Sequence, residues 1–164
     1  MRTKQFHLAQ ANIARMRTPR EDPAMKSFID QLDYINSVAD RSPGFVWRFD
    51  EEGNATATRV FGDERILFNM SVWESVDALY DYVYKSDHLG PFRDRRNWFE
   101  KMESPSMVLW WIPAGSLPNA EDARERLDLL TRLGPSERAF TFKAMFGPDG
   151  APVQRDRPRD WTHA

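Results

Sequence analysis

The residues with the clearest capacity for chemistry lie between Arg65 and Phe99, around His88, the one histidine far from both chain ends. Asp87 directly precedes His88. A histidine beside a carboxylate can move a proton near neutral pH, or ligate a metal or a haem iron. The alternative is that His88 caps the C-terminal end of the preceding helix, where the helix dipole favours a cation. The sequence alone leaves both interpretations open.

A cluster of arginines, Arg93, Arg95 and Arg96, follows this histidine. Arginine binds a carboxylate or the propionates of haem through paired hydrogen bonds. Asp94 and Glu100 lie among the arginines, so a solvated helix face with local ion pairs is the alternative. A dedicated zinc or iron site is not predicted, because cysteine is absent and the other histidines lie near the two ends of the chain.

Aromatic side chains could complete such a site. Tyr84, Trp98 and Trp111 are candidate ligand contacts, together with Arg93. Tryptophans belong to the core more often than to a cofactor site, so core packing is the alternative. Trp110 and Trp111 are adjacent in an apolar run and should point to opposite faces of a strand, and the sequence does not decide which one faces a ligand.

The composition bounds the kind of protein. The chain has 164 residues, of which 41% are hydrophobic, which predicts one domain over residues 1–147 and a flexible tail over 148–164. A net charge of -2 gives no basic excess for nucleic-acid binding. The most apolar run, Met107–Pro113, is too short to cross a bilayer, so no membrane span is predicted. The absence of cysteine is compatible with a reducing cytoplasm, which is the location we expect.

Apolar spacing and turn residues predict the elements that must position these groups. Five strands are expected, at residues 6–14, 45–49, 64–73, 107–113 and 140–146. A hairpin-type turn is expected at 51–56, leading through Phe61 to a second turn. Helices are expected to begin at Pro23, after Ser75, at Pro91 and after Asn119.

This order predicts an α+β domain: a ferredoxin-like split βαβ fold with extra helices. Helices on only one side of the sheet would leave an apolar face exposed. We therefore expect a homodimer in which two sheets pack face to face and enclose a barrel.

Alternation along the strands sorts the side chains by face. On the 64–73 strand one face carries only apolar residues and is expected to pack on the helices, whereas the other carries Asn69, Ser71 and Trp73. Gln10 and Asn12 share the mixed face of the first strand. We expect these polar residues to line a ligand pocket inside the barrel. The alternative is that Asn69 and Gln10 bond each other or a buried water.

Two sets of motifs resemble known families. The run ILFNMSVWESVDALYDYVYKSD is similar to the third strand and second helix of dimeric α/β-barrel proteins, a superfamily that contains antibiotic-biosynthesis and haem-degrading monooxygenases. FHLAQANIAR, LFNMSVWES, YKSDHLGPFRDRRNWF and MVLWWIPAG together resemble a bacterial domain-of-unknown-function family numbered 3291, over most of residues 5–147. The resemblance implies the fold and the homodimer.

Two function classes follow. In the first, an oxygenase binds an electron-rich aromatic or a tetrapyrrole in the barrel, where Asn12, Asn69 and Trp73 orient it and His88 acts as base or axial ligand. The catalytic candidates are then His88, Asn69 and Trp73; no cofactor is required, and haem ligation through His88 is a variant. In the second, a non-catalytic dimer holds a small hydrophobic molecule as a stress or pathway accessory protein. The chain contains no phosphate-binding glycine loop, GxSxG elbow or HExxH motif.

Overall fold

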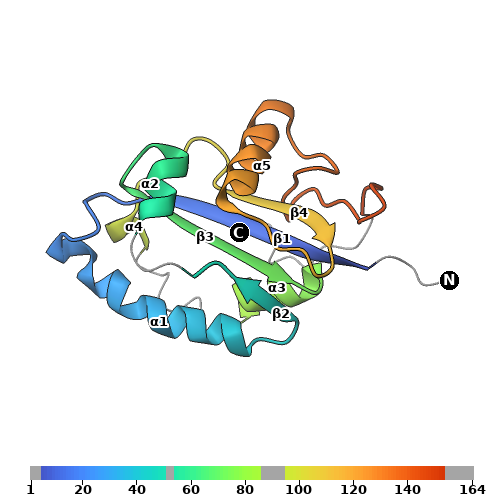
Figure 1. Cartoon of the computed structure of the whole chain (residues 1–164). Coiled ribbons are helices and arrows are strands. Elements are labelled where there is room, and N and C mark those ends of the chain that lie inside the picture. Colours follow the sequence, from blue (N-terminus) through green and yellow to red (C-terminus); the bar gives the residue numbers. More distant parts are fainter. Residues whose placement is uncertain (1–4, 51–53, 86–94, 154–164) are drawn as a thin grey trace.

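The structure is a computed structural model that describes residues 5–50, 54–85 and 95–153 (Figure 1). Its strands are β1 (Phe6–Arg15), β2 (Phe45–Arg48), β3 (Ile66–Trp73) and β4 (Met107–Pro113). Its helices are the short 3₁₀ helix η1 (Pro23–Met25), α1 (Lys26–Arg41), α2 (Ala55–Phe61), α3 (Val76–Lys85), α4 (Arg95–Trp98) and α5 (Ala120–Leu133).

The four strands form one antiparallel sheet in the order β2-β3-β1-β4. The connections β1–α1–β2 and β3–α3–β4 are the two interleaved halves of a split βαβ fold. The predicted α+β, ferredoxin-like class is therefore confirmed, with α2, α4 and α5 as the extra helices.

The helix starts follow from local side-chain chemistry. Asp22 accepts a hydrogen bond from the backbone N–H of Ala24 at 2.8 Å, and Pro23 occupies the first helical position. At α5, Asn119 and Asp122 form a capping box, in which each side chain accepts a hydrogen bond from the other's backbone N–H. Both predicted starts are confirmed.

A close approach fixes the entry to β2. Gly44 has a φ of 81°, and a Cβ built there would lie 2.5 Å from the Cβ of Ala78 in α3. Only glycine suits this turn, because a side chain would be strained and would also collide with the helix. The start of α3 is capped by Ser75, whose Oγ accepts a hydrogen bond from the backbone N–H of Ala78 at 3.1 Å.

Helices cover both faces of the sheet. One face packs against α5, and Phe61 of α2 packs there as well; α2 and α5 lie side by side (Figure 1). The buried sheet residues of this face are Ala9, Ala11, Met70, Val72, Val108, Trp110 and Ile112. The opposite face packs against α1, α3 and the segment 140–146. Its buried sheet residues are Leu8, Gln10, Ser71, Trp73 and Leu109.

This arrangement corrects the prediction of which sheet face the helices cover. The sorting of residues by face is right, but the mixed face that carries Gln10 and Ser71 lies under α1 and α3, not on a helix-free side. The apolar face is covered by α2 and α5 of the same chain. Alternation shows which residues share a face, whereas the extra helices decide what covers it. The argument for a sheet-on-sheet dimer therefore loses its premise.

Two local predictions are also wrong. The segment 140–146 is not a strand: Phe140 makes one isolated bridge to Leu109, and a turn that closes between Thr141 and Ala144 then reverses the chain. The connection through Phe61 is helical, because α2 begins after Asn54. The predicted hairpin turn at 51–56 is therefore wrong in its second half, because Ala55 and Thr56 belong to α2. Residues 51–53 lie outside the described residues.

Backbone hydrogen bonds continue past residue 147, the predicted end of the domain. The backbone N–H of Gly147 donates to Ala151, and that of Val153 donates to Met145, both at 2.9 Å. These bonds form a turn that is part of the folded chain, and the rest of the tail, 154–164, lies outside the described residues. The division into domain and tail stays a prediction. No helix in the described ranges is long and apolar enough to cross a membrane.

Candidate functional site

A hydrogen-bonded polar network lies on the face that α1 and α3 cover. Gln10 Nε2 donates to Asn69 Oδ1 at 2.9 Å and to Ser71 Oγ at 3.1 Å. Trp73 Nε1 donates to the same Ser71 Oγ at 2.8 Å. Gln10 and Ser71 are each 6% exposed and Trp73 is 0% exposed. The hypothesis that Asn69 and Gln10 bond each other is confirmed.

The network fixes one end of Asn69 and leaves the other end available. Its Oδ1 is bonded to Gln10, and within the described part of the chain its Nδ2 has no hydrogen-bond partner. Asn69 is exposed, and so is Asn12, which faces it across the β1–β3 ladder. The amide N–H groups of Asn69 are therefore presented to solvent or to a ligand.

Asn69 lines a cavity of about 100 Å³, which we call the Asn69 cavity. It lies where β2 is too short to cover β3: the β2–β3 register runs from Trp73 to Ser71, and one further backbone bond joins Phe49 to Met70. The walls come from α1, the end of β2, the start of α2 and the first half of β3. The lining residues are Arg20, Leu32, Asn36, Arg48, Phe49, Asp50, Asn54, Ala57, Leu67, Phe68 and Asn69.

Some polar groups of the cavity are already occupied. Arg48 Nε lies 2.9 Å from Asp40 Oδ1, and Arg48 Nη1 lies 3.4 Å from Asp50 Oδ1. The hydrogen bond to Asp40 raises the pKa of Arg48 above its ordinary value. Asn54 Nδ2 donates to the carbonyls of Glu64 at 3.0 Å and Ile66 at 2.7 Å. Arg48 and Asn54 therefore form part of the cavity wall, and most of their hydrogen-bond donors are already used within the protein.

Three polar side chains of the cavity stay uncommitted. Arg20, Asn36 and the Nδ2 end of Asn69 form no hydrogen bond or ion pair with any described residue. Arg20 and Asn36 are half-buried. The cavity therefore combines one free guanidinium, two amide groups and apolar walls.

The remaining predicted contacts lie elsewhere. Tyr84 packs on Tyr80 at 4.7 Å between ring centroids, and burial raises its pKa. Trp98 is 7% exposed and packs on Phe28 at 5.4 Å. Trp111 Nε1 donates to the carbonyl of Phe146 at 2.7 Å. None of the three predicted residues lines the Asn69 cavity.

Trp73 is part of the network and of the core at once. Its ring stacks on Tyr82 at 5.0 Å, and its contact with Phe45 is edge-on at 5.5 Å. Burial raises the pKa of the Tyr82 phenol above its ordinary value. The predicted site residues His88 and Arg93 lie outside the described residues.

Sequence reasoning missed Arg20, Asn36 and Arg48 as site residues. Asn36 has a signal that could have been used, since it lies one turn beyond Leu32 on the helix face that contacts the sheet. Arg20 lies in a loop whose path no periodicity reveals. Arg48 lines the cavity because β2 ends at this residue, and the apolar pattern of the sequence does not show where that strand ends.

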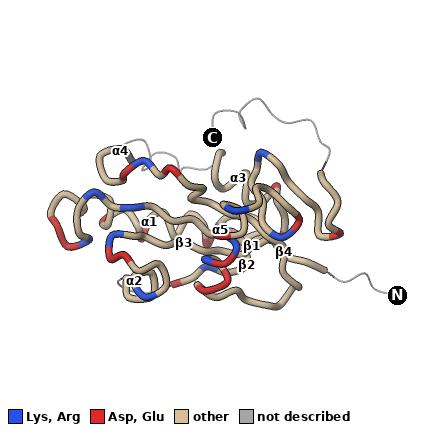
Figure 2. Tube along the Cα trace, turned by 90° about the horizontal axis from the view of Figure 1, so that it is seen from above, with Lys and Arg blue, Asp and Glu red and all other residues tan. Residues whose placement is uncertain are grey.

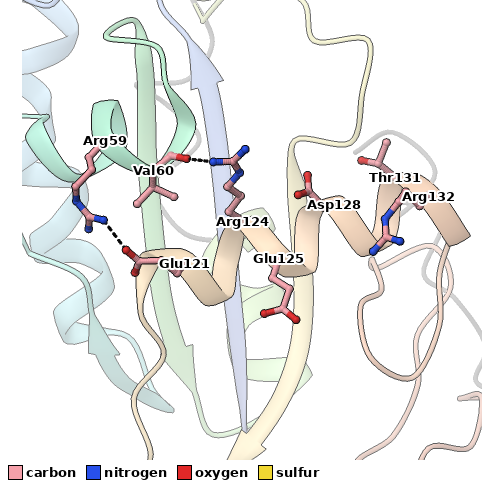
Figure 3. A pocket seen from close by; sticks show the side chains of 8 residues that line it. All are labelled: Arg59, Val60, Glu121, Arg124, Glu125, Asp128, Thr131 and Arg132. Atoms are coloured by element: carbon pink, nitrogen blue, oxygen red, sulfur yellow. Dashed lines mark hydrogen bonds and ion pairs between the residues drawn. The ribbon is translucent and has the colours of Figure 1, made fainter.

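A second and larger depression is a groove of about 580 Å³ between α2 and α5 (Figure 3). Arg59 Nη1 lies 2.7 Å from Glu121 Oε1, and Arg124 donates to the carbonyl of Val60 (Figure 3). Three arginines and three acidic residues line the groove, so its charges balance. Basic and acidic residues are likewise interspersed over the described chain (Figure 2). We interpret the groove as the solvated seam between two helices.

No metal site is indicated by the described residues, because they contain no group of three His, Cys, Asp or Glu side chains that could hold an ion.

Strand order and cavity together define a ferredoxin-like α+β domain with a small polar cavity at an open sheet edge. The chain belongs to the family described as Domain of unknown function (DUF3291), whose model matches residues 7–156. The membership predicted from the residue motifs is confirmed.

Two solved structures are similar in chain trace. SnoaB, a cofactor-independent oxygenase from Streptomyces nogalater, has 16% identity and a TM-score of 0.43, over 69% of this chain and 98% of SnoaB. A Chloroflexus aurantiacus protein assigned as an antibiotic biosynthesis monooxygenase has 9% identity and a TM-score of 0.42, over 69% of this chain and 97% of that one. No curated protein matches. The fold assignment here rests on the strand order.

Proposed function

We propose that this protein binds a small polar molecule in the Asn69 cavity. The observation that carries the proposal is the convergence of Arg20, Asn36 and the Nδ2 end of Asn69 on one cavity, where these groups have no hydrogen-bond or ion-pair partner among the described residues. Binding sites in proteins combine apolar walls with a few fixed polar groups. Leu32, Phe49 and other apolar residues supply such walls here.

The polar network prepares Asn69 for this role. Because Gln10 holds its Oδ1, the amide cannot turn over without losing a hydrogen bond. Gln10 is in turn held by Ser71. A donor that is fixed before binding costs less ordering entropy when the ligand arrives.

Oxygenation is the enzymatic form of this proposal, and the motif resemblance supports it. In that form Asn12, Asn69 and Trp73 orient an aromatic substrate and His88 acts as base, without a required cofactor. Trp73 argues against direct contact, because it is 0% exposed and its indole N–H is bonded to Ser71. Binding without turnover is the form that the geometry supports best.

A haem or other tetrapyrrole does not fit the Asn69 cavity. Its volume is about 100 Å³, whereas pockets for drug-sized ligands are roughly 300 to 1,000 Å³. Haem ligation through His88 is therefore considered only as part of the oxygenase alternative.

A homodimer and a cytoplasmic location also stay predictions: sedimentation at micromolar concentration tests the first, and localisation of a tagged chain tests the second.

The test is an NMR screen of ¹⁵N-labelled protein with small polar fragments. A fragment that binds should shift the side-chain amide signals of Asn69 and Asn36, and Asn69→Ala should weaken it by about tenfold, the loss of one well-placed hydrogen bond. Asn97→Ala, an exposed amide on α4, is the matched control and should not change binding. The proposal fails when no fragment shifts the cavity signals, or when both variants bind as the wild type does.

Two further measurements separate the enzymatic form. Oxygen uptake with an electron-rich phenol or an anthrone would support turnover, and its absence across a broad panel would support binding alone. A Soret band that forms on haem addition and is lost in His88→Ala would support haem ligation.

A further inference from the structure

We infer that the ligand of the Asn69 cavity is a small carboxylate whose charge is bound by Arg20; this inference rests on the proposed function. The first argument is charge. Among the described lining residues, Arg48 is paired with Asp40 and Asp50, whereas the Arg20 guanidinium has no carboxylate partner. A monocarboxylate would neutralise this guanidinium with a single negative charge.

The second argument is which arginine is free. Arg48 is bonded to Asp40 and Asp50, and its side chain is 21% exposed. Arg20 is half-buried and has no described partner. A partly desolvated guanidinium without a counter-ion favours an anion. Its planar fork matches the two oxygens of a carboxylate.

The third argument is the hydrogen-bonding character of the other free groups. Asn69 presents its N–H groups, because the hydrogen bond from Gln10 holds its oxygen toward the network. Asn36 can turn its amide to donate as well. A carboxylate only accepts hydrogen bonds, so it suits a cavity that offers a guanidinium and fixed amide donors.

The fourth argument is size. The cavity volume of about 100 Å³ equals roughly three water molecules, at about 30 Å³ each. It therefore holds a carboxylate group and one or two further carbon atoms. A larger ligand would place its carboxylate inside and the rest of the molecule outside, beyond the open edge of β3.

Sodium propionate is the probe, and neutral propionamide of the same shape is its comparison. Both are titrated into ¹⁵N-labelled protein at constant chloride, and the shifts of the Asn69 and Asn36 side-chain amides are followed. We expect propionate to bind at least tenfold more tightly than propionamide, because a charged hydrogen bond is stronger than a neutral one. Propionate binding should also fade below a pH of about 5, where the propionate carboxylate becomes protonated and Arg20 keeps its charge.

The variants locate the charge. Arg20→Gln should weaken propionate binding at least tenfold and leave propionamide unchanged, while Arg20→Lys should recover part of the loss. Arg132→Gln removes an exposed arginine of the α2–α5 groove, with the same change in net charge, and should have no effect. The spectra of all variants report whether the fold is kept.

The failures are distinguishable. Equal binding of propionate and propionamide in the cavity would overturn the carboxylate and leave the proposed binding function standing. Equal weakening by Arg20→Gln and Arg132→Gln would show a general charge effect and would overturn the role of Arg20. No shift of the cavity signals by propionate, propionamide or any screened fragment would overturn both.

Discussion

Ser71→Ala is the sharpest test of the polar network. The Ser71 hydroxyl accepts hydrogen bonds from Gln10 at 3.1 Å and from Trp73 at 2.8 Å. Removing it leaves the Trp73 indole N–H without a partner at 0% exposure, where water cannot replace the bond. Gln10 keeps its bond to Asn69.

The expected loss of stability follows from these contacts. Each lost hydrogen bond costs about 1 kcal/mol, and a stranded buried donor raises the cost toward 1 to 3 kcal/mol. We expect Ser71→Ala to lower the free energy of unfolding by about 2 to 3 kcal/mol, or the melting temperature by roughly 5 to 10 °C for a domain of this size. Serine and alanine differ by one oxygen atom, so a packing defect adds little.

Urea unfolding followed by circular dichroism measures the loss, and Ser116→Ala, at an exposed serine, is the matched control. A double-mutant cycle with Trp73→Phe isolates the indole bond, because phenylalanine has no N–H to strand. The two mutations should couple by about 1 kcal/mol or more. A loss below about 0.5 kcal/mol for Ser71→Ala, or additive effects in the cycle, would refute the network as a stabilising element.

Further predictions concern the turns, the helix cap and the ion pair that hold the elements around the site in place. Gly44→Ala and Gly62→Ala both place alanine at positive φ, but only the first meets a helix Cβ at 2.5 Å; it should destabilise by at least 1 kcal/mol more than the roughly 1 kcal/mol of the second in urea unfolding. Asn119→Ala should cost about 1 kcal/mol in the same assay, through loss of the α5 capping box. The hydrogen bond from Arg15 lowers the pKa of Asp63, so its contribution is present above the ordinary value of 3.8 and is lost as pH falls below it. The stability difference between wild type and Asp63→Asn should therefore shrink between pH 7 and pH 3.

Much of the fold could be predicted because strands and helices differ in their apolar period. Alternation located β1 and β3, and the uninterrupted apolar run of β4 was recognised at Met107–Pro113. Asp22 and Asn119 gave the starts of the α1 region and α5, since a capping side chain acts within three residues of its own position. Each of these signals depends on residues that are close together in the chain, so it can be recognised from the sequence alone.

The candidate site could be predicted only in part, because it depends on contacts between distant segments. Asn69 and Gln10 were found, since alternation places them on one face. Arg20 reaches the cavity from a loop, and Arg48 lines it only because β2 ends early. The residues of α2 are rich in threonine, valine and phenylalanine, which favour strands, yet tertiary packing on α5 makes the segment helical.

One chemical choice explains how the same residue serves the fold and a ligand. An amide at position 69 can accept from Gln10 with its oxygen and still offer N–H groups to the cavity. A carboxylate there would accept the same bond but present a second acceptor oxygen and a negative charge, and an apolar side chain would leave Gln10 with Ser71 alone. Because Gln10 and Ser71 are each 6% exposed, the hydrogen bonds that Gln10 and Trp73 donate to Ser71 are shielded from water. The burial that makes the network stabilising is therefore also what fixes the direction of the Asn69 donor, and with it the preference of the cavity for an acceptor.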